Sequence, residues 1–437
     1  MLLTSSYAVR VAAYFGGLFL VMGTQLPYLP VWLDDRGLDA GGIALVASAP
    51  LFVRLVATPA IAFIADRYAI HRRMVIVLTW LGLATLLALH HQASLVAIAL
   101  LAIVFTLTWS TIMPLIETIA TDGVRARGHD YGRMRLWGSI TFVVANFVGG
   151  AVLSAYGPDG VVWLMVAGAG LTVAAAHALP RRVQAPHPEI QGPEAQAPEA
   201  QVPEIQDSEA RQESITATPP SRAAKAATLS PAEAFRLAAA PAFVVFLVAG
   251  GFAQASHAVF YIFGTLHWQA QGISATFIGV LWAIGVIAEI ALFWWSAHAI
   301  RAFGATGLIL LGGLGGVLRW WLMGFDPPVW ALVPLQVLHG LTFGASHLGA
   351  IHFIAQAVSQ RQAGTAQALY ASITAGVAMA AMMLVAGALF PHVAGRSYWA
   401  MAASSGLGSL AAWWLWQHWH GEVIGDARAS RRSSGKA

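Results

Sequence analysis

The sequence contains no cysteine, which excludes disulfide bonds, thiolate metal sites and cysteine nucleophiles. It is also poor in charge, because only 10% of its 437 residues are Asp, Glu, Lys or Arg, whereas soluble domains carry about 25%. It has no HExxH or GxSxG motif, no acidic metal cluster and no nucleotide-binding loop. We therefore expect neither an enzyme nor a nucleotide-driven pump, and we expect no metal or cofactor.

Apolar residues make up 58% of the chain, and its mean hydropathy is +0.66. This composition predicts that most of the chain lies in lipid. The net charge of +4 is better explained by membrane topology than by nucleic-acid binding. Residues 1–10 lead into a long apolar run without an A-x-A cleavage site, so we interpret this segment as a retained membrane span.

Twelve apolar runs are long enough to cross about 30 Å of hydrocarbon. They fall at 7–29, 41–64, 73–89, 94–119, 133–156, 161–179, 242–266, 274–297, 306–325, 329–357, 364–390 and 397–419. The predicted fold is an all-α membrane protein of twelve transmembrane helices in two pseudo-symmetric six-helix bundles. The predicted units are a bundle at 1–180, a linker at 181–229, a bundle at 230–420 and a tail at 421–437.

The predicted linker differs in composition from the rest of the chain. Between residues 188 and 207 it repeats a five-residue unit four times, each unit beginning with proline and containing glutamate and glutamine. Such a segment cannot form a core, so we expect an extended, disordered spacer. Ser230-Pro231-Ala232-Glu233 then has the pattern of a capping box that begins a short surface helix.

The distribution of basic residues predicts the orientation of the chain. With the N-terminus inside, the inner loops, the linker and the tails hold twenty of the twenty-four Lys and Arg residues. We therefore expect a protein of the bacterial inner membrane with both termini on the cytoplasmic side. We also expect a monomer.

The two halves of the sequence resemble each other at an offset of about 234 residues. The matching pairs are Gly16-Gly17 with Gly250-Gly251, Arg36-Gly37-Leu38 with Gln271-Gly272-Ile273, Leu107-Thr108-Trp109 with Leu341-Thr342-Phe343, and Gly138-Ser139-Ile140 with Ala371-Ser372-Ile373. The last pair needs a one-residue slip. Parallel repeats of this kind place a substrate site near the bilayer midplane, between the halves.

Charged residues inside the predicted spans are candidates for function. Glu117 and Arg135 lie on consecutive helices joined by a short loop, so they can meet as antiparallel neighbours. Arg54, Glu289 and Arg319 lie deeper, where a charge costs about 2.5 kcal/mol or more and needs a partner or water. A purely structural pairing remains the alternative for each of these residues.

Three histidines, His339, His347 and His352, lie on one predicted span. Histidine titrates near neutrality and can relay a proton. None of these three pairs has the i, i+4 spacing that would place two rings on one face for a metal ion, so a metal site is rejected. Gln25 on the first span and His257 on the seventh are further polar candidates for substrate binding.

Two motifs resemble signatures of the major facilitator superfamily. Pro114-x-x-Glu117, followed by Tyr131-Gly132-Arg133-x-Arg135-x-x-Gly138, resembles the helix 4–helix 5 signature of a branch that holds 3-phenylpropionate-type permeases and lactose-permease-type proton symporters. The resemblance implies that Glu117 and Arg135 form the core of a substrate site, and we expect Gln25, His257 and Glu289 to contribute to it. Asp66-Arg67 similarly resembles the cytoplasmic signature that latches neighbouring helices in one conformation.

The resemblance continues at Arg319 and His339, which match the Arg and His that serve proton coupling in lactose-permease-type carriers. The family's proton-carrying Glu is Thr342 here. The family's helix-eight Glu falls at Val286, with Glu289 one turn further on. We therefore assign coupling to Glu289, Arg319 and His339, with Glu289 or His339 carrying the proton.

The sequence thus predicts a secondary active transporter that binds a small-molecule substrate and a proton within the lipid bilayer. Retention of the hairpin signature and loss of several sugar-carrier charges favour an aromatic monocarboxylate, such as a phenylpropionate-like acid, as the symported solute. A sugar or nucleoside symporter is the alternative, and so is a membrane sensor that transports nothing.

Overall fold

The computed structural model describes residues 6–92, 94–127, 129–180 and 230–424, and these residues form helices and no strand. The predicted spacer and most of the predicted tail lie outside this range. Five helices precede residues 181–229, the longest stretch outside the described range: α1 (Ser6–Asp35), α2 (Ala40–Arg67), α3 (His71–His90), α4 (Leu95–Arg127) and α5 (Tyr131–Ala178). The elements after it are α6 (Pro231–Ala238), α7 (Pro241–Ala255), α8 (Ala258–Ala270), α9 (Ala275–Trp294), α10 (Ser296–Met323), α11 (Val329–Val337), η1 (Gly340–Ala345), α12 (Ser346–Ala357), α13 (Ala363–Ala371), η2 (Ser372–Ala378), α14 (Met379–Val393), η3 (Ala394–Ser397) and α15 (Tyr398–His418).

Within the described residues, ten helical stretches are long and apolar enough to cross a membrane. Two of them have double length. The 48-residue α5 is interrupted at Gly157, whose φ of 69° is left-handed and precedes Pro158. The 56-residue stretch Ala363–His418 is interrupted at Ala394, whose φ is 45°. Each of these stretches is long enough for two passages, so ten spans are compatible with the twelve predicted helices.

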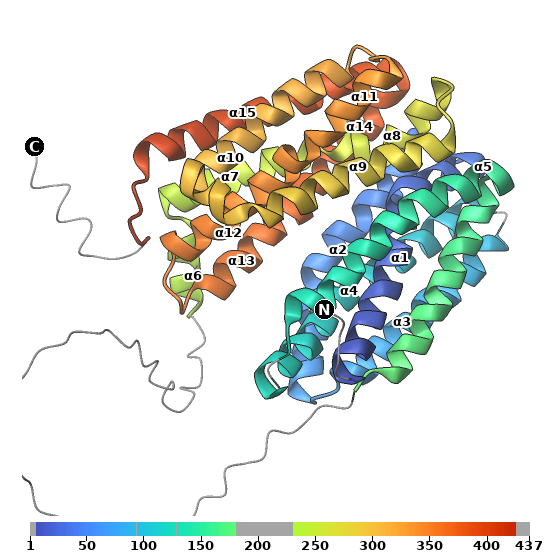
Figure 1. Ribbon diagram of the computed structural model, residues 1–437, viewed down its shortest axis with the longest axis horizontal. Coiled ribbons are helices and arrows are strands. Elements are labelled where there is room, and N and C mark those ends of the chain that lie inside the picture. Colours follow the sequence, from blue (N-terminus) through green and yellow to red (C-terminus); the bar gives the residue numbers. More distant parts are fainter. Residues whose placement is uncertain (1–5, 93, 128, 181–229, 425–437) are drawn as a thin grey trace, which may run out of the picture.

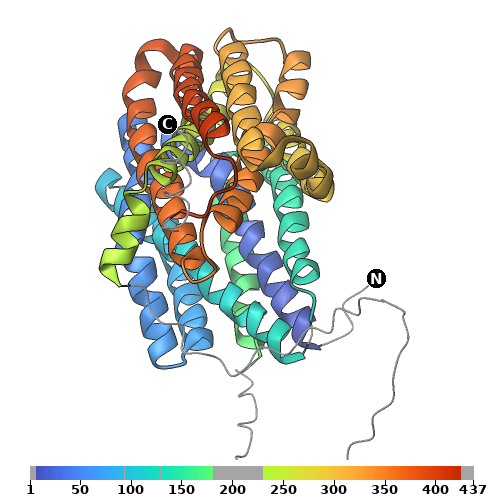
Figure 2. The ribbon, with the colours of Figure 1, turned by 90° about the vertical axis from the view of Figure 1, so that its left-hand side faces the viewer.

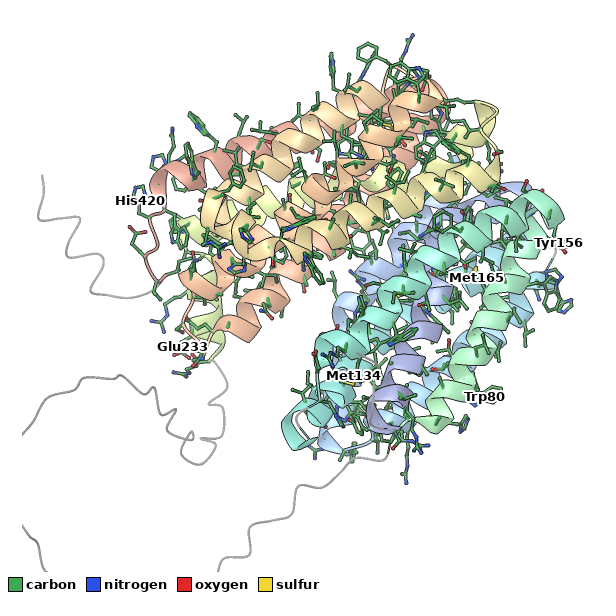
Figure 3. All side chains as sticks on the ribbon, in the orientation of Figure 1. Trp80, Met134, Tyr156, Met165, Glu233 and His420 are labelled. Atoms are coloured by element: carbon green, nitrogen blue, oxygen red, sulfur yellow. The ribbon has the colours of Figure 1, made fainter. Side chains whose placement is uncertain are left out.

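The helices gather in two groups, α1–α5 and α6–α15 (Figure 1). The groups meet near the turn of α5 and the start of α9, and they diverge toward the end of the molecule that carries α6. Figure 2 views the molecule from this diverging end, with most of the yellow-to-red helices above the blue-to-green ones. Met134 and Met165 are buried inside the first group, whereas Trp80 and Tyr156 point outward (Figure 3).

The internal repeat predicted from the sequence has a counterpart in the packing. A Cβ atom built on Gly16 would lie 3.5 Å from Cγ2 of Thr141, and one built on Gly250 would lie 3.3 Å from Cγ2 of Thr374. The one-residue slip in the sequence alignment is what pairs Thr141 with Thr374. The two halves therefore use the same small-residue contact between their first and fifth spans.

The halves touch closely at the end away from α6. Gly279 of α9 lies against the carbonyl oxygen of Asn146, and Gly150 lies against that of Ala275. The Tyr28 hydroxyl donates to the same Asn146 oxygen at 2.6 Å. Glycine is required at this crossing because a Cβ at either position would overlap a backbone carbonyl. This contact closes the linker-distal side of the molecule.

Three spans of the second half are irregular near their middle. The seventh span breaks at Ser256 and His257, between α7 and α8. The tenth and eleventh spans contain the π-helical segments η1 and η2. Such irregular turns are frequent at functional sites, because they change which side chains face a cavity.

The short helix α6 begins with the predicted capping box. The Ser230 hydroxyl accepts from the backbone N–H of Glu233, and the Glu233 carboxylate accepts from the backbone N–H of Ser230 at 2.8 Å. The backbone hydrogen bond from Ser230 lowers the pKa of the exposed Glu233 carboxyl below its ordinary value. The predicted capping box is confirmed.

Candidate functional site

Two cavities of about 240 Å³ each lie between the two groups of helices. The first, which we call the Arg135 cavity, has five polar lining residues and a wall of aromatic rings. Its polar residues are Arg135, Ser139, Glu289, Gln336 and His339, and its rings are Phe19, Phe142, Phe260, Tyr261, Trp282 and Phe343. The second, which we call the Arg54 cavity, shares only Leu26, Phe142 and Tyr261 with the first.

Arg135 enters its cavity from the first turns of α5. Its guanidinium carbon lies 3.9 Å from the ring centre of Phe19, a cation–π contact. Glu117, its predicted partner, lies within electrostatic reach, but these two described side chains form no direct ion pair. Tyr131 lies near both, and its hydroxyl donates to Glu117 Oε1 at 3.4 Å. Arg135 therefore lines the cavity, whereas Glu117 does not.

Glu289 lies across the Arg135 cavity, on α9, and interacts electrostatically with Arg135. The arrangement brings one cation and one carboxylate from opposite halves into the same cavity. Arg54, at the position of the repeat equivalent to Glu289, lines the other cavity instead. Arg54 and Glu289 therefore line different cavities, and the charge that Glu289 faces is Arg135.

Arg319 is fully buried beside this cavity, and all its hydrogen-bond partners are neutral groups. Its Nη1 lies 3.1 Å from His339 Nδ1 and donates to Thr342 Oγ1 at 3.1 Å, while its Nη2 donates to Gln336 Oε1 at 2.8 Å. The guanidinium also packs on the ring of Trp320 at 4.4 Å. A buried arginine without a carboxylate partner is costly unless hydrogen bonds and aromatic faces compensate for lost hydration.

Thr342, where the resembling family has its proton-carrying Glu, connects two basic residues in this chain. Its hydroxyl accepts from Arg319 and lies 3.1 Å from His257 Nε2. His257 Nδ1 lies 3.2 Å from the carbonyl oxygen of Gln254. His257 is fully buried and lines neither cavity. The structure thus gives His257 a position in the Arg319 network rather than on the wall of a binding site.

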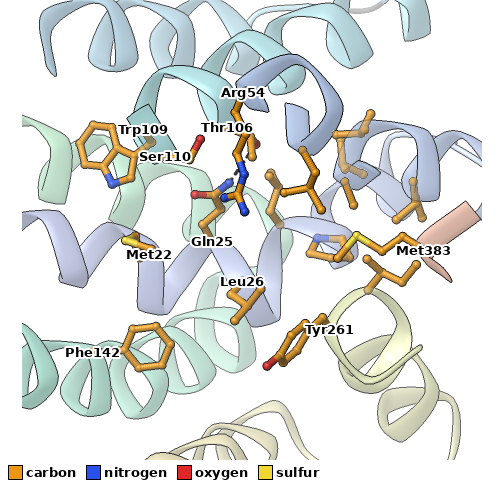
Figure 4. A pocket seen from close by; sticks show the side chains of 18 residues that line it. Met22, Gln25, Leu26, Arg54, Thr106, Trp109, Ser110, Phe142, Tyr261 and Met383 are labelled. Carbon is orange, nitrogen blue, oxygen red and sulfur yellow. Dashed lines mark hydrogen bonds between the residues drawn. The ribbon is translucent and has the colours of Figure 1, made fainter. Parts of the chain in front are cut away.

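Gln25 and Arg54 point together into the Arg54 cavity (Figure 4). Gln25 Nε2 donates to Thr106 Oγ1 at 2.9 Å. Arg54 Nη2 donates to the carbonyl oxygen of Ala375 at 2.7 Å, and Ala375 belongs to η2 in the opposite half. Gln25 is therefore separated from Arg135 and Glu289 by the shared residues Leu26, Phe142 and Tyr261.

The predicted latch residues, Asp66 and Arg67, are the last two residues of α2, just before the loop to α3. Asp66 Oδ1 lies 2.9 Å from His71 Nε2, and Arg67 lies over the ring of Tyr68 at 5.8 Å, so both contacts are local. Arg72 makes the connection to another span, donating to the carbonyl oxygens of Leu179 and His177 at 2.8 and 2.6 Å. The sequence pattern did not separate Arg72 from ordinary basic loop residues.

Gln336 and Tyr261 are two of the cavity residues that sequence reasoning missed. Gln336 precedes His339 by three residues, a spacing that places both on one helix face and could have identified it. Tyr261 is one of many aromatic residues, and nothing in the sequence distinguishes it. Its position beside both cavities depends on how α8 packs against α1.

Comparison with known proteins establishes the family. Residues 11–401 match the family model described as "MFS_1 like family". The chain belongs to this family, within the major facilitator superfamily. It is 29% identical over 387 residues to a "Probable 3-phenylpropionic acid transporter" of Escherichia coli (strain K12), covering 88% of this chain and 91% of that protein. It is 27% identical over 379 residues to a maltose permease of Geobacillus stearothermophilus, covering 85% of each.

Solved structures show the same fold. The nucleoside transporter NupG superposes with a TM-score of 0.74 at 17% identity, covering 94% of this chain and 99% of that one. A D-xylose-proton symporter superposes with a TM-score of 0.63 at 13% identity, covering 95% and 98%. The protein is therefore a multi-pass membrane transporter of the major facilitator type and not an enzyme.

Proposed function

We propose that this transporter is a proton symporter that brings a small aromatic monocarboxylate into a bacterial cell across the inner membrane. The observation that carries the proposal is the Arg135 cavity, where one arginine and one glutamate from opposite halves are surrounded by aromatic rings. The planar guanidinium of Arg135 suits a bidentate contact with a carboxylate. Phe19, Phe142 and Trp282 would pack around the substrate ring.

Charge balance supports coupling to a proton. In and beside the cavity, the two cations Arg135 and Arg319 are balanced by ionised Glu289 and Glu117, so a bound substrate carboxylate would add an uncompensated negative charge. In a cavity of low dielectric this repulsion is strong, so the anion binds best when Glu289 takes a proton. Arg319 and His339 adjoin the cavity and complete the proposed coupling group. Glu117, through Tyr131, would orient Arg135.

Alternating access follows from the closed contact between the halves. With both chain ends in the cytoplasm, the linker-distal contact at Gly279 and Asn146 would seal the periplasmic side, and the helices would diverge on the cytoplasmic side. This is an inward-facing arrangement. Rocking of the halves would separate Gly279 from Asn146 and expose the cavities to the other side.

The relatives keep a sugar as the competing substrate, because the chain is also similar to a maltose permease. A single assay separates the candidates. Purified protein in proteoliposomes would be offered 3-phenylpropionate, maltose and uridine while internal pH and substrate exchange are recorded. Only 3-phenylpropionate should drive proton influx.

Two variants test the assigned roles. Glu289→Gln should abolish substrate-driven proton influx while substrate exchange persists, and Arg135→Lys should raise the KM for 3-phenylpropionate by about tenfold. Arg236→Gln, on the exposed face of α6, is the matched control and should behave as wild type. Exchange without a proton signal in the wild type would refute symport. Proton influx with maltose or uridine would refute the proposal that the substrate is an aromatic monocarboxylate.

A further inference from the structure

The Arg54 cavity has the composition of a second anion site. Its wall is predominantly apolar, and Met22, Trp109 and Phe142 supply surface for an apolar ligand body. Among the described residues that line it, Arg54 is the only ionised side chain. Gln25, Thr106, Ser110 and Tyr261 add amide and hydroxyl groups. Cavities of this kind bind ligands with an apolar body and one polar group that fixes orientation.

Arg54 has no carboxylate partner within the described part of the chain. Its side chain is half-buried in the middle of α2, and it donates a hydrogen bond to the neutral carbonyl oxygen of Ala375. A cation at this depth is costly without a counter-charge. An anion in the cavity would provide the counter-charge at the position where Arg54 and Gln25 converge (Figure 4).

The two cavities adjoin and share part of their lining. Only Leu26, Phe142 and Tyr261 line both, with Arg54 on one side and Arg135 on the other. Tyr261 lies in the first turn of α8, directly after the irregular backbone between α7 and α8.

We propose that the Arg54 cavity is a second binding subsite for the carboxylate of the transported monocarboxylate, distinct from the subsite at Arg135. The proposal rests on the proposed function. The carboxylate replaces the Ala375 carbonyl as the partner of the guanidinium. Because Ala375 lies in the opposite half, occupancy of the subsite releases a hydrogen bond that joins the halves, which links binding to their relative movement.

The test compares two ligands of the same body, 3-phenylpropionate and the uncharged 3-phenylpropanol. Their binding to the purified full-length protein would be measured by calorimetry. Arg54→Gln should weaken 3-phenylpropionate about tenfold or more and leave 3-phenylpropanol within twofold. Arg54→Lys, which keeps the charge, should give an intermediate loss. Arg236→Gln is the control, and thermal unfolding in detergent checks that each variant is folded.

A variant of the other arginine makes the subsites distinguishable. Arg135→Gln should keep a residual preference for the carboxylate, and Arg54→Gln combined with Arg135→Gln should lose it. If Arg54→Gln weakens both ligands equally, or if Arg135→Gln alone removes the preference, Arg54 is a tether and the subsite is refuted. If the wild type binds both ligands alike, the proposed acid substrate and the subsite are both refuted. Acid transport with unchanged affinity in Arg54→Gln refutes the subsite alone.

Discussion

Arg319 and His339 are joined by a 3.1 Å contact between Nη1 and Nδ1, inside the second half and away from water. Because a guanidinium has no acceptor, Nδ1 of His339 must accept this hydrogen bond. A neutral His339 ring then carries its proton on Nε2, and His339 also lines the Arg135 cavity. One side chain thus contacts both the buried cation and the proposed substrate space.

This contact predicts different effects for two substitutions of His339. Asparagine can place its side-chain oxygen near the position of Nδ1, whereas leucine leaves a charged donor unpaired. His339→Leu should lower the free energy of unfolding by about 1.5–3 kcal/mol, and His339→Asn by clearly less. Denaturant unfolding in detergent measures both. Equal losses in the two variants would show that the hydrogen bond to Nδ1 contributes nothing specific.

The helices and the relation between the halves could be predicted from the sequence. Both follow from local hydrophobicity and from matched motifs, as the contacts Gly16–Thr141 and Gly250–Thr374 illustrate. Gly16 and Gly250 were visible as a repeated pair of glycines. Their partners in the structure, Thr141 and Thr374, correspond to each other once the one-residue slip is allowed for.

The composition of the site could not be predicted in the same way, because it depends on the lateral packing of helices. Arg54 and Glu289 occupy equivalent positions in the sequence, yet Tyr261 and its neighbours separate them into two cavities. Glu117 and Arg135 match a signature, yet the side chain that contacts Glu117 directly is Tyr131, which donates a hydrogen bond to it. Sequence spacing determines which residues share one face of a helix. It does not determine which side chain of a neighbouring helix packs against that face.

Ala69 in the loop after α2 predicts a stabilising substitution. Its φ is 53°, and Gly304, 235 residues later, has a φ of 66°. The left-handed region costs a non-glycine residue about 1–2 kcal/mol, while glycine adds entropy to the unfolded chain. Ala69→Gly should therefore raise the free energy of unfolding by about 0.5–1 kcal/mol. The reverse change, Gly304→Ala, should lower it, and a lower stability of Ala69→Gly would contradict the reasoning.

Gly279 predicts how the closed side can be opened. A Cβ there would overlap the carbonyl oxygen of Asn146 and lie 2.9 Å from the Tyr28 hydroxyl. Gly279→Ala should disfavour the closed contact by about 1–2 kcal/mol, or about 5–30-fold in population. A cysteine placed at Leu29, in a chain that has none of its own, should then react faster with an impermeant maleimide from the linker-distal side. Gly170→Ala, with open space around it, should leave the rate unchanged.

Arg72 and Arg73 are neighbours of identical chemistry, and only one of them should matter for stability. Arg72 ties the start of α3 to the end of α5 through two carbonyl oxygens, at His177 and Leu179, whereas Arg73 is exposed. Both of those carbonyls lie in the last residues before the gap, where helical partners run out. Arg72→Gln should lower the free energy of unfolding by about 1–2 kcal/mol, and Arg73→Gln should change it by less than about 0.5 kcal/mol. Parallel unfolding curves of the two variants in detergent make the comparison, and an equal effect would mean that only the positive charge of this loop counts.

If the tie also acts as the conformational latch, Arg72→Gln should slow uptake in proteoliposomes more than Asp66→Asn does, since the contacts of Asp66 are local.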